Sequence, residues 1–378
     1  MPSRTKHNHL TVGLDIGTTK ICAIAVESDS KETLNVVGVG TAKSEGLRKG
    51  VVVNIEKTVK SIKKAVEECE LMCGEQINSV YAGIAGHHIK GQNSRGMVTV
   101  YHNRTVTEED IRRVIDAAQV LIPNDREVLH ILPSEFIVDD QDGVQNPLGM
   151  AAARLEVNVH IVTGSVTSAQ NIIKCCNQAG LDVEDIVLEP LASSQAVLSP
   201  DEQEVGVVLV DIGGGTTEIA ILALNGVVFS SSLKTGGDRF NEAIVSYIRR
   251  KYGVLVGEST AERIKETVGC ATPESEDKTM EIRGRNLAEG VPNTINFSSL
   301  EAYEAISGPL SSILQSIRNA LEQSPPELSA DISERGIVLT GGGALLTDLD
   351  IMISEQTGIP VIVADDPLTC VVKGGGIA

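Results

Sequence analysis

Two short segments rich in glycine and threonine carry the residues best suited to chemistry in this chain of 378 residues. Asp15-Ile-Gly-Thr-Thr-Lys20 and Asp211-Ile-Gly-Gly-Gly-Thr-Thr217 each follow an apolar run. Glycines permit close backbone approach to a ligand, and their N–H groups and threonine hydroxyls can donate to phosphate oxygens. Each segment is therefore expected to hold part of a polyphosphate, with Lys20 offsetting its charge. The expected phosphate contacts are Gly17, Thr18, Thr19, Lys20, Gly213, Gly214, Gly215, Thr216 and Thr217.

Asp15 and Asp211 end their apolar runs directly before these turns. A carboxylate there can hold Mg²⁺ directly or through its water shell, since Mg²⁺ prefers oxygen ligands and binds readily beside phosphates. A third cluster follows another apolar run and lets a flat base and a ribose lie against bare backbone. Its expected nucleotide contacts are Gly341, Gly342, Gly343 and Ala344. The three clusters together predict bound ATP or ADP with Mg²⁺.

Alternative phosphate motifs are missing from the sequence. No G-x-x-x-x-G-K-[ST] or G-x-G-x-x-G segment is present, which weakens a P-loop or a Rossmann interpretation. A tight hairpin with a capped turn would explain any one of the glycine segments alone. Three such segments in this order favour a nucleotide site.

The elements that must position these residues follow from spacing. The two Asp-Ile-Gly segments lie about half a chain apart, which predicts two related domains. Each is flanked by β-branched and small apolar residues, so each is expected to form a strand, a tight turn and a second strand. Apolar residues at helical spacing predict one helix around residues 55–69 and another that Thr107 caps and that runs to Ile122. Alternating strands and helices indicate an α/β architecture, and residues 199–204 are expected to form a surface loop.

Composition argues against several classes of function. The net charge is −19, from 32 basic and 51 acidic residues, and a field of that sign repels nucleic acid and anionic lipid. There is no Trp, so a platform for stacking single-stranded bases is not expected. Seven scattered cysteines fit a reduced, cytoplasmic compartment. The polar segment 1–10 does not resemble a leader, and no apolar run reaches the ~18 residues of a membrane span.

These motifs resemble those of the actin/Hsp70/sugar-kinase superfamily, and they resemble two bacterial families of it at once. Residues 11–205 are similar to the FtsA family of cell-division proteins, and residues from about 220 to 378 are similar to the MreB family of cell-shape proteins. The FtsA-like stretches include Tyr81-Ala-Gly-Ile-Ala-Gly86, Gln141-Asp-Gly-Val-Gln-Asn-Pro-Leu-Gly149 and Leu188-Glu-Pro-Leu-Ala-Ser-Ser194. The MreB-like stretches include Gly236-Gly-Asp-Arg-Phe240, Arg283-Gly-Arg-Asn-Leu-Ala-Glu-Gly290 and Asp366-Pro-Leu-Thr-Cys370. The sequence is that of a natural mosaic or an engineered chimera.

The resemblance implies an actin-like α/β fold with two related domains around a nucleotide cleft. It also implies an FtsA-type subdomain 1C in place of the usual actin subdomain 1B. The implied division of the chain is 11–82 for the first part of subdomain 1A, 83–162 for subdomain 1C, 163–235 for subdomain 2A with the second phosphate motif, 236–310 for an MreB-type subdomain 2B, and 311–378 for the rest of 2A and the return to 1A.

Further site residues are carried over from the resemblance. Glu189 follows an apolar run, precedes Pro190 and matches the MreB glutamate before proline, which implies that it orients a water onto the γ-phosphate. Glu262 and Lys265 would reach the ribose or the adenine, although an exposed ion pair one helical turn apart would also explain them. The resemblance adds Gly237 and Asp238 as nucleotide contacts.

The function implied is that of an actin-like ATP-binding cytoskeletal protein. It would polymerise into filaments, hydrolyse ATP slowly and act in cell division or cell shape. An organelle-positioning filament, a small-molecule kinase and a nucleotide-binding scaffold remain alternatives. Because subdomain 2B is of the MreB type, binding to FtsZ is doubtful and a scaffold such as RodZ is the expected partner in the divisome or elongasome. A cytoplasmic location is expected, with membrane contact only through partners or a segment that this sequence does not contain.

Overall fold

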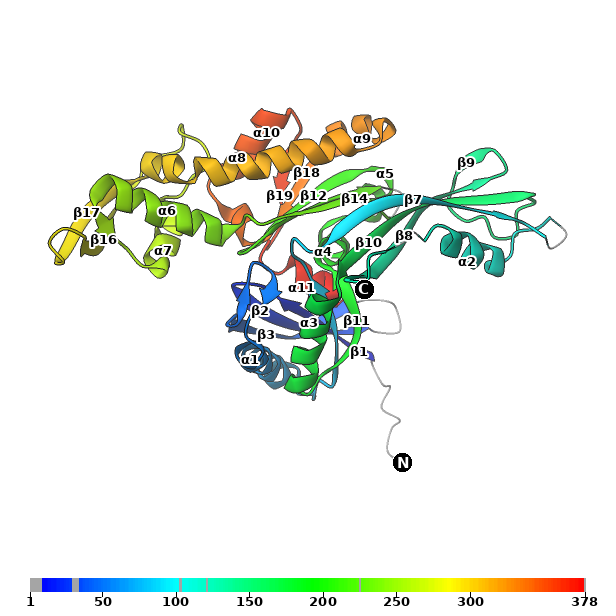
Figure 1. Cartoon of the computed structure of the whole chain (residues 1–378), viewed down its shortest axis with the longest axis horizontal. Coiled ribbons are helices and arrows are strands. Elements are labelled where there is room, and N and C mark those ends of the chain that lie inside the picture. Colours follow the sequence, from blue (N-terminus) through cyan, green and yellow to red (C-terminus); the bar gives the residue numbers. More distant parts are fainter. Residues whose placement is uncertain (1–8, 29–33, 102–103, 120–121, 224–225, 377–378) are drawn as a thin grey trace.

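The computed structural model describes residues 9–28, 34–101, 104–119, 122–223 and 226–376, and it shows two α/β lobes with an inserted unit beside them (Figure 1). Lobe 1 is built on the sheet β11-β6-β1-β2-β3, lobe 2 on the sheet β14-β13-β12-β18-β19, and the inserted unit on the sheet β7-β10-β8-β9. The strand orders of the two lobes correspond position by position. In each sheet the central strand and the two strands on one side of it are antiparallel neighbours, and the two strands on its other side are parallel to it.

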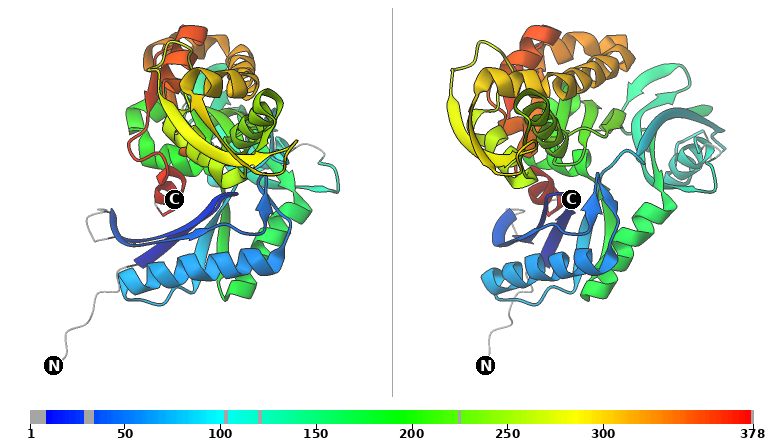
Figure 2. Two further views of the ribbon diagram at one scale, coloured as in Figure 1. Left: turned by 90° about the vertical axis from the view of Figure 1, so that its left-hand side faces the viewer. Right: turned by 60° about the vertical axis from the view of Figure 1, so that its left-hand side comes forward.

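In lobe 1, α1 and α3 pack side by side on one face of the sheet (Figure 2). Helix α1 begins after Asn54, whose side chain accepts from the N–H of Lys57, and it ends at Gly74 in the left-handed conformation. On the opposite face α11 packs against β1 and α4. The elements of lobe 1 are β1 (His9–Ile16), β2 (Lys20–Ser28), β3 (Leu34–Lys43), β4 (Leu47–Arg48), β5 (Val51–Val52), α1 (Ile55–Cys73), β6 (Ser79–Ile84), α3 (Val166–Ala179), β11 (Asp182–Leu188), α4 (Glu189–Val197) and α11 (Cys370–Gly375).

The inserted unit leaves lobe 1 after β6 and returns through β10, which runs directly into α3. Its elements are β7 (Lys90–Thr99), α2 (Glu108–Ala117), β8 (Arg126–Val138), β9 (Gln141–Val144) and β10 (Arg154–Ser165). It has its own apolar core, including Val114, Leu155 and Val157. Thr107 caps α2 as expected, but the expected continuation to Ile122 is wrong, because α2 ends at Ala117. Ile122 precedes Pro123, and a residue before proline avoids helical backbone.

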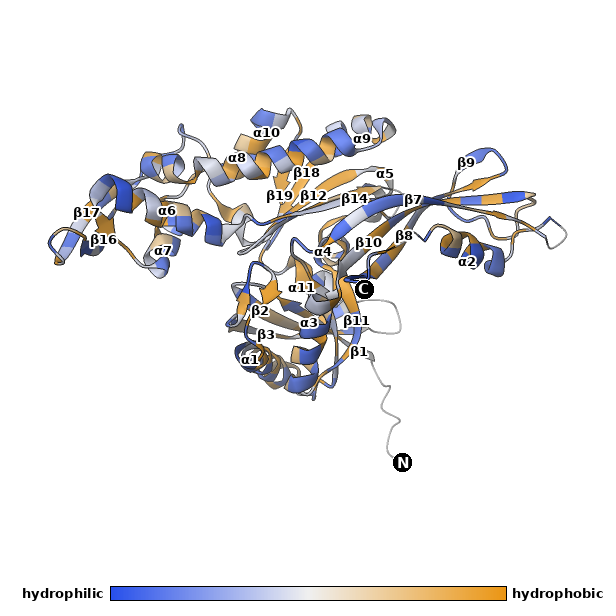
Figure 3. Cartoon of the chain, in the orientation of Figure 1, coloured by the Kyte–Doolittle hydropathy of each residue, from blue (hydrophilic) through white to orange (hydrophobic). Residues whose placement is uncertain are grey.

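Lobe 2 carries the longest helix, α8, and an outer layer formed by α6, α7 and three short strands. Its inner strands β12 and β18 are mostly apolar (Figure 3), because both faces of this sheet are covered, and their polar residues, Asp211 and Thr340, lie near the strand ends. The elements are α5 (Pro200–Val205), β12 (Val207–Ile212), β13 (Thr217–Ala223), β14 (Gly226–Leu233), α6 (Gly237–Tyr252), β15 (Val254–Leu255), α7 (Glu258–Val268), β16 (Thr279–Asn286), β17 (Pro292–Ser298), α8 (Ser299–Gln323), η1 (Pro326–Leu328), α9 (Ser329–Arg335), β18 (Ile337–Thr340), η2 (Gly342–Leu345), α10 (Leu349–Thr357) and β19 (Val361–Val363).

Both expected hairpins are present. Asp15 pairs with Cys22 across the first turn, and Asp211 pairs with Glu218 across the second. The expected loop at 199–204 is wrong, because residues 200–205 form helix α5. Ser199 accepts from the N–H of Glu202 at 3.4 Å, and the Glu202 carboxylate accepts from the N–H of Ser199 at 2.7 Å. This reciprocal cap starts a short helix where turn residues alone predict a loop.

Within the described residues, no helix is long and apolar enough to cross a membrane. The expectation that segment 1–10 is not a leader falls mainly on residues 1–8, which lie outside the described ranges.

Candidate functional site

A cavity of about 380 Å³ lies between the two lobes, and both Asp-Ile-Gly turns line it. Lobe 1 also contributes the start of α4, and lobe 2 contributes α6, α7 and the Gly341–Gly343 turn. The expected site residues that line it are Asp15, Gly17, Thr18, Thr19, Lys20, Glu189, Asp211, Gly213, Gly214, Gly215, Thr216, Gly237, Glu262, Lys265, Gly341, Gly342 and Gly343. Segments far apart in the sequence therefore converge on one space.

Three expected residues do not line this cavity. The Thr217 hydroxyl is fully buried and donates to the Thr235 carbonyl at 2.7 Å. Ala344 is 3% exposed and packs into the core of lobe 2. Asp238 lies in the first turn of α6, where burial raises the pKa of its carboxyl to about 6. None of these three residues is part of the cavity lining.

The two hairpins touch each other at their glycines. A Cβ atom on Gly214 would lie 1.9 Å from Thr19 Oγ1, and one on Gly215 would lie 2.6 Å from Thr18 Oγ1. Thr18 Oγ1 also accepts from the N–H of Gly50 at 3.0 Å. Any side chain in place of these glycines would push the turns apart. The bare backbone and hydroxyls form a cradle that suits phosphate oxygens.

Carboxylates gather at the end of the cavity that the two Asp-Ile-Gly turns line. Burial raises the pKa of Asp15 to about 7, with a further rise from the charge of Asp211 and an opposing effect from Lys20. Burial also raises the pKa of Asp211, which its hydrogen bonds from Thr340 and Ser193 oppose. Buried carboxylates at this density favour a bound cation, because an opposite charge within a few ångströms restores their ionised form.

The described residues do not form a metal site from protein ligands alone, since no group of three or more His, Cys, Asp or Glu side chains within them is placed to hold an ion. Mg²⁺ needs no such set, because it keeps several waters and is usually held by one or two carboxylates together with phosphates. The donors Asp15 and Asp211 beside a phosphate cradle fit an ion that arrives with a nucleotide.

Glu189 is the first residue of α4 and faces the same end of the cavity. Burial raises the pKa of its carboxyl well above the usual value, followed by the charges of Asp15, Asp211 and Glu218. A cation beside the two aspartates would lower that pKa and leave a carboxylate that can accept a proton from water. The position suits a group that orients a water molecule.

Lys20 makes a contact that the sequence does not indicate. Its ammonium donates to the Leu368 carbonyl at 2.9 Å, so it joins the first hairpin to the segment that follows β19. Leu368 lines the cavity together with Leu345, and both supply exposed apolar surface suited to a base. A Cβ on Gly237 would lie 3.1 Å from Lys265 Nζ, which places that ammonium near the start of α6.

Several lining residues were not expected from the sequence. Gly50 comes from the turn between β4 and β5, and Gly83 comes from β6, where a Cβ would meet Glu189 Cγ at 3.6 Å. Phe240 lies one turn into α6 and is fully buried. The Lys49-Gly50 pair is a turn signal, but it does not indicate which surface the turn faces. The only signal for Phe240 in the sequence is its place among apolar residues at helical spacing, which predicts a core residue.

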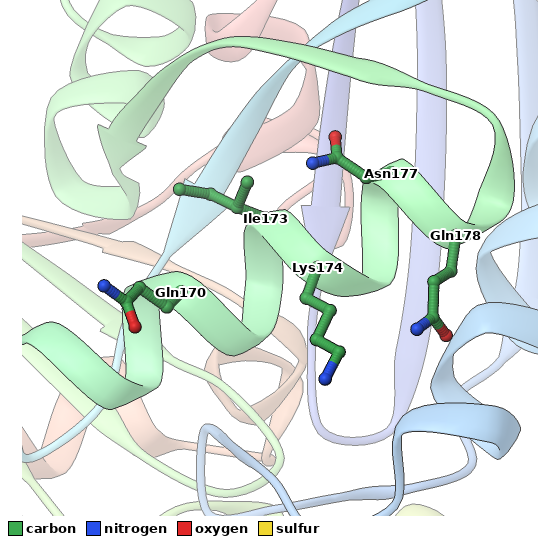
Figure 4. A pocket seen from close by; sticks show the side chains of 5 residues that line it. All are labelled: Gln170, Ile173, Lys174, Asn177 and Gln178. Carbon is green, nitrogen blue, oxygen red and sulfur yellow. The ribbon is translucent and has the colours of Figure 1, made fainter.

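A second, open depression lies on the surface of lobe 1 (Figure 4). Its five lining side chains, Gln170, Ile173, Lys174, Asn177 and Gln178, all come from α3. One cation, three amides and one isoleucine on a single helix do not converge on a common point. The chemistry of the protein therefore concentrates in the cavity between the lobes.

Two known protein families match this chain. A family model described as MreB/Mbl protein matches residues 149–378, and one described as the SHS2 domain inserted in FTSA matches residues 86–163. The cell division protein FtsA of Pseudomonas aeruginosa is 40% identical over 353 residues, covering 93% of this chain and 82% of that protein. The cell shape-determining protein MreB of Escherichia coli is 57% identical over 193 residues, covering 51% of this chain and 56% of that protein. The expected resemblance to both families is confirmed.

The fold is also that of a solved actin-like protein. The crystal structure of MreB5 of Spiroplasma citri bound to AMPPNP matches with a TM-score of 0.66 at 21% identity, covering 99% of this chain and 96% of that chain. At this identity the match concerns the fold. The expected actin-like α/β architecture is confirmed.

Proposed function

Because the chain belongs to the MreB/Mbl family and is a near full-length relative of FtsA, we propose that it is an actin-like cytoskeletal protein that binds ATP between its lobes, assembles into filaments and acts in bacterial cell division or cell shape. One observation carries the proposal. Two related phosphate turns, one from each lobe, line a single cavity together with Asp15, Asp211 and Glu189. Such a cavity can change shape with the nucleotide because each lobe holds its own side of the ligand.

Each group of residues that lines the cavity would have its own role in binding or hydrolysis. Backbone N–H groups of Gly213 to Gly215 and the Thr18 and Thr19 hydroxyls would hold phosphate oxygens. Lys265 and Glu262 would contact the ribose or base, and the Gly341–Gly343 turn would leave space for them. Mg²⁺, when bound, would offset phosphate charge, and Asp15 and Asp211 would hold it directly or through water. Glu189 would orient the attacking water and accept its proton.

The two family matches also suggest which surfaces meet partners. We infer that the inserted unit takes part in contacts between subunits or with division proteins. The outer layer of lobe 2, within residues 236–310, is proposed as an MreB-type subdomain 2B. Its partner would be a membrane-spanning scaffold of the RodZ kind rather than FtsZ. We further propose that subdomain 1A begins with residues 11–82, that subdomain 1C spans 83–162 and subdomain 2A 163–235, and that residues 311–378 complete 2A and return to 1A.

Sedimentation tests the function directly. The full chain is incubated with Mg²⁺ and ATP, with Mg²⁺ and ADP, or without nucleotide, and then centrifuged. The amounts of protein in the pellet and in the supernatant are compared, and the pellet is imaged for filaments. We expect filaments that depend on nucleotide. A protein that stays monomeric in all three conditions and instead transfers phosphate from ATP to a small molecule would contradict the cytoskeletal assignment.

A further inference from the structure

Asp15 and Asp211 occupy equivalent places in the two halves of the sequence, but the structure holds them differently. Asp211 Oδ2 accepts two hydrogen bonds, from Thr340 Oγ1 at 3.0 Å and from Ser193 Oγ at 3.3 Å. Among the described residues, no group donates a hydrogen bond to the Asp15 carboxylate. The two related halves of the chain therefore differ in the hydrogen bonds that they make to Asp15 and Asp211.

The two hydroxyls come from different lobes. Thr340 is the last residue of β18 and lies beside Asp211 in the parallel pair of β12 and β18. Ser193 lies in α4, which packs against α11 and also contacts β12. Both donor residues are fully buried, with 0% exposure. Asp211 is therefore fixed at the point where the lobes join, by groups that water cannot replace.

Both hydrogen bonds go to the same oxygen, which leaves the other oxygen of Asp211 for a ligand. A Cβ on Gly341 would lie 2.5 Å from Asp211 Oδ1, and Gly341 has a φ of 79°, so only glycine leaves this oxygen room. Within the described part of the chain, Oδ1 has no hydrogen-bond partner. A hydroxyl next to a carboxylate can only donate to it, so both donors stabilise the ionised form of Asp211.

We propose that Ser193 and Thr340 are positioning residues for Mg²⁺-dependent nucleotide binding, because they hold Asp211 in one orientation with Oδ1 free for the ion or its water shell. This inference rests on the proposed nucleotide function of the cavity. It makes Asp211 the fixed carboxylate of the pair and Asp15 the adjustable one. Groups that orient a metal ligand through hydrogen bonds typically contribute about 10–100-fold to metal affinity.

The test uses the full chain and measures binding of a fluorescent ATP analogue over a range of free Mg²⁺ concentrations and in EDTA. In Ser193→Ala and Thr340→Val, we expect the Mg²⁺ concentration that half-maximally tightens nucleotide binding to rise by about tenfold or more. Nucleotide affinity in EDTA should stay at the level of the original protein. Thr340→Ser, which keeps the hydroxyl, should restore the original Mg²⁺ dependence.

Ser194→Ala is the matched control. Ser194 is the next residue of α4, is 1% exposed, and donates through its hydroxyl to the Leu191 carbonyl at 2.7 Å instead of to Asp211. Its loss removes the same atom from the same buried helix, and the Mg²⁺ dependence should not move. An equal shift in Ser194→Ala would show that any damage to α4 has this effect, and it would overturn the positioning role.

Asp211→Asn separates failure of this inference from failure of the proposed function. If Asp211→Asn removes the tightening by Mg²⁺ while Ser193→Ala and Thr340→Val bind like the original protein, the positioning role is wrong and the metal site stands. If all three variants keep the original Mg²⁺ dependence, the metal site in the cavity is wrong as well. The two single variants test the role independently, so one that does not fold leaves the other to decide.

Discussion

The backbone N–H of Gly86 donates a hydrogen bond to Glu218 Oε1 at 3.0 Å, which ties the start of the inserted unit to the second phosphate hairpin. Ser232 donates to the same oxygen at 2.9 Å. Glu218 is 3% exposed, and burial raises the pKa of its carboxyl to about 7. A single buried side chain thus joins the end of β6 in lobe 1 to two strands of lobe 2.

Removing this side chain should weaken the protein. Glu218→Ala leaves the buried N–H of Gly86 without its acceptor, which costs about 1–3 kcal/mol, and the half-buried Ser232 hydroxyl loses the same acceptor. Glu218→Gln keeps an acceptor oxygen and removes a charge that burial disfavours, so its stability at pH 8 should equal or exceed that of the original protein. Denaturant unfolding measures both, and hydrogen exchange at Gly86 reports the bond itself. Equal stability of all three proteins would show that the bond contributes nothing.

Contact between the hairpins should control nucleotide affinity. Gly214→Ala places a Cβ 1.9 Å from Thr19 Oγ1, so the two turns must separate and the phosphate groups lose donors from one side. We expect affinity for ATP to fall by about tenfold or more, which corresponds to about 1.4 kcal/mol. Gly308→Ala is the control, because a Cβ there meets no atom within 4 Å. Calorimetric titration of both variants gives the comparison, and equal affinities would contradict the close contact.

Glu189 should act on hydrolysis and not on binding. Glu189→Gln keeps the size of the side chain but cannot accept a proton, so phosphate release should slow by roughly 100-fold while ATP affinity is unchanged. Glu184→Gln changes an exposed glutamate on β11, a few residues before Glu189, and should release phosphate normally. Unchanged phosphate release in Glu189→Gln would remove Glu189 from the catalytic role.

Acid should weaken the docking of the inserted unit on lobe 2. His160 lies in β10, is 2% exposed, and bonds through Nε2 to Ser230 Oγ at 2.9 Å and through Nδ1 to Asn93 Oδ1 at 2.6 Å. Burial lowers the pKa of His160 to about 4. The unfolded chain has the ordinary pKa of about 6.5, so this contribution to stability is complete above pH 6.5 and is lost as the pH falls toward 4.

His160→Gln removes the titrating group and keeps a hydrogen-bonding side chain. Between pH 7.5 and pH 5, the original protein should therefore lose on the order of 1–2 kcal/mol more of its free energy of unfolding than the variant does. Denaturant unfolding at several pH values measures the difference. Parallel pH profiles would show that His160 does not stay neutral in the folded protein.

The sequence predicts the two Gly/Thr turns, because a tight turn requires particular residue types at adjacent positions. It does not predict which side chains face the cavity, because that depends on the direction of the backbone. Thr216 and Thr217 are adjacent, but β13 begins at Thr217, so successive side chains point to opposite sides and only Thr216 lines the cavity. Gly50 lines the cavity from a turn between short strands, and no local pattern connects that turn with Thr18. Such contacts depend on how distant segments pack.

The different hydrogen bonding of the two aspartates could not be predicted from the sequence either. Asp15 and Asp211 have nearly the same neighbours in the sequence, and their strands pair in the same way. The donors that distinguish Asp211 are Thr340, which lies far along the chain in β18, and Ser193 from α4. Hydroxyls in buried helices and strands are common, so neither residue stands out before the fold is known.

The position of helix α11 affects the order in which the parts of the protein can fold during synthesis. A Cβ on Gly374 would lie 1.5 Å from the Ala192 carbonyl oxygen, and one on Gly13 would lie 2.8 Å from the Val372 carbonyl oxygen, so α11 fits tightly between α4 and β1. Lobe 2 and the inserted unit each come from one continuous stretch of chain and can fold while synthesis continues. Lobe 1 takes β1, β2 and β3 from an early part of the chain, but it cannot close until residues 370–375 have been synthesised. The cavity between the lobes is thus completed last, because Val371 of α11 is translated after the other residues that line it.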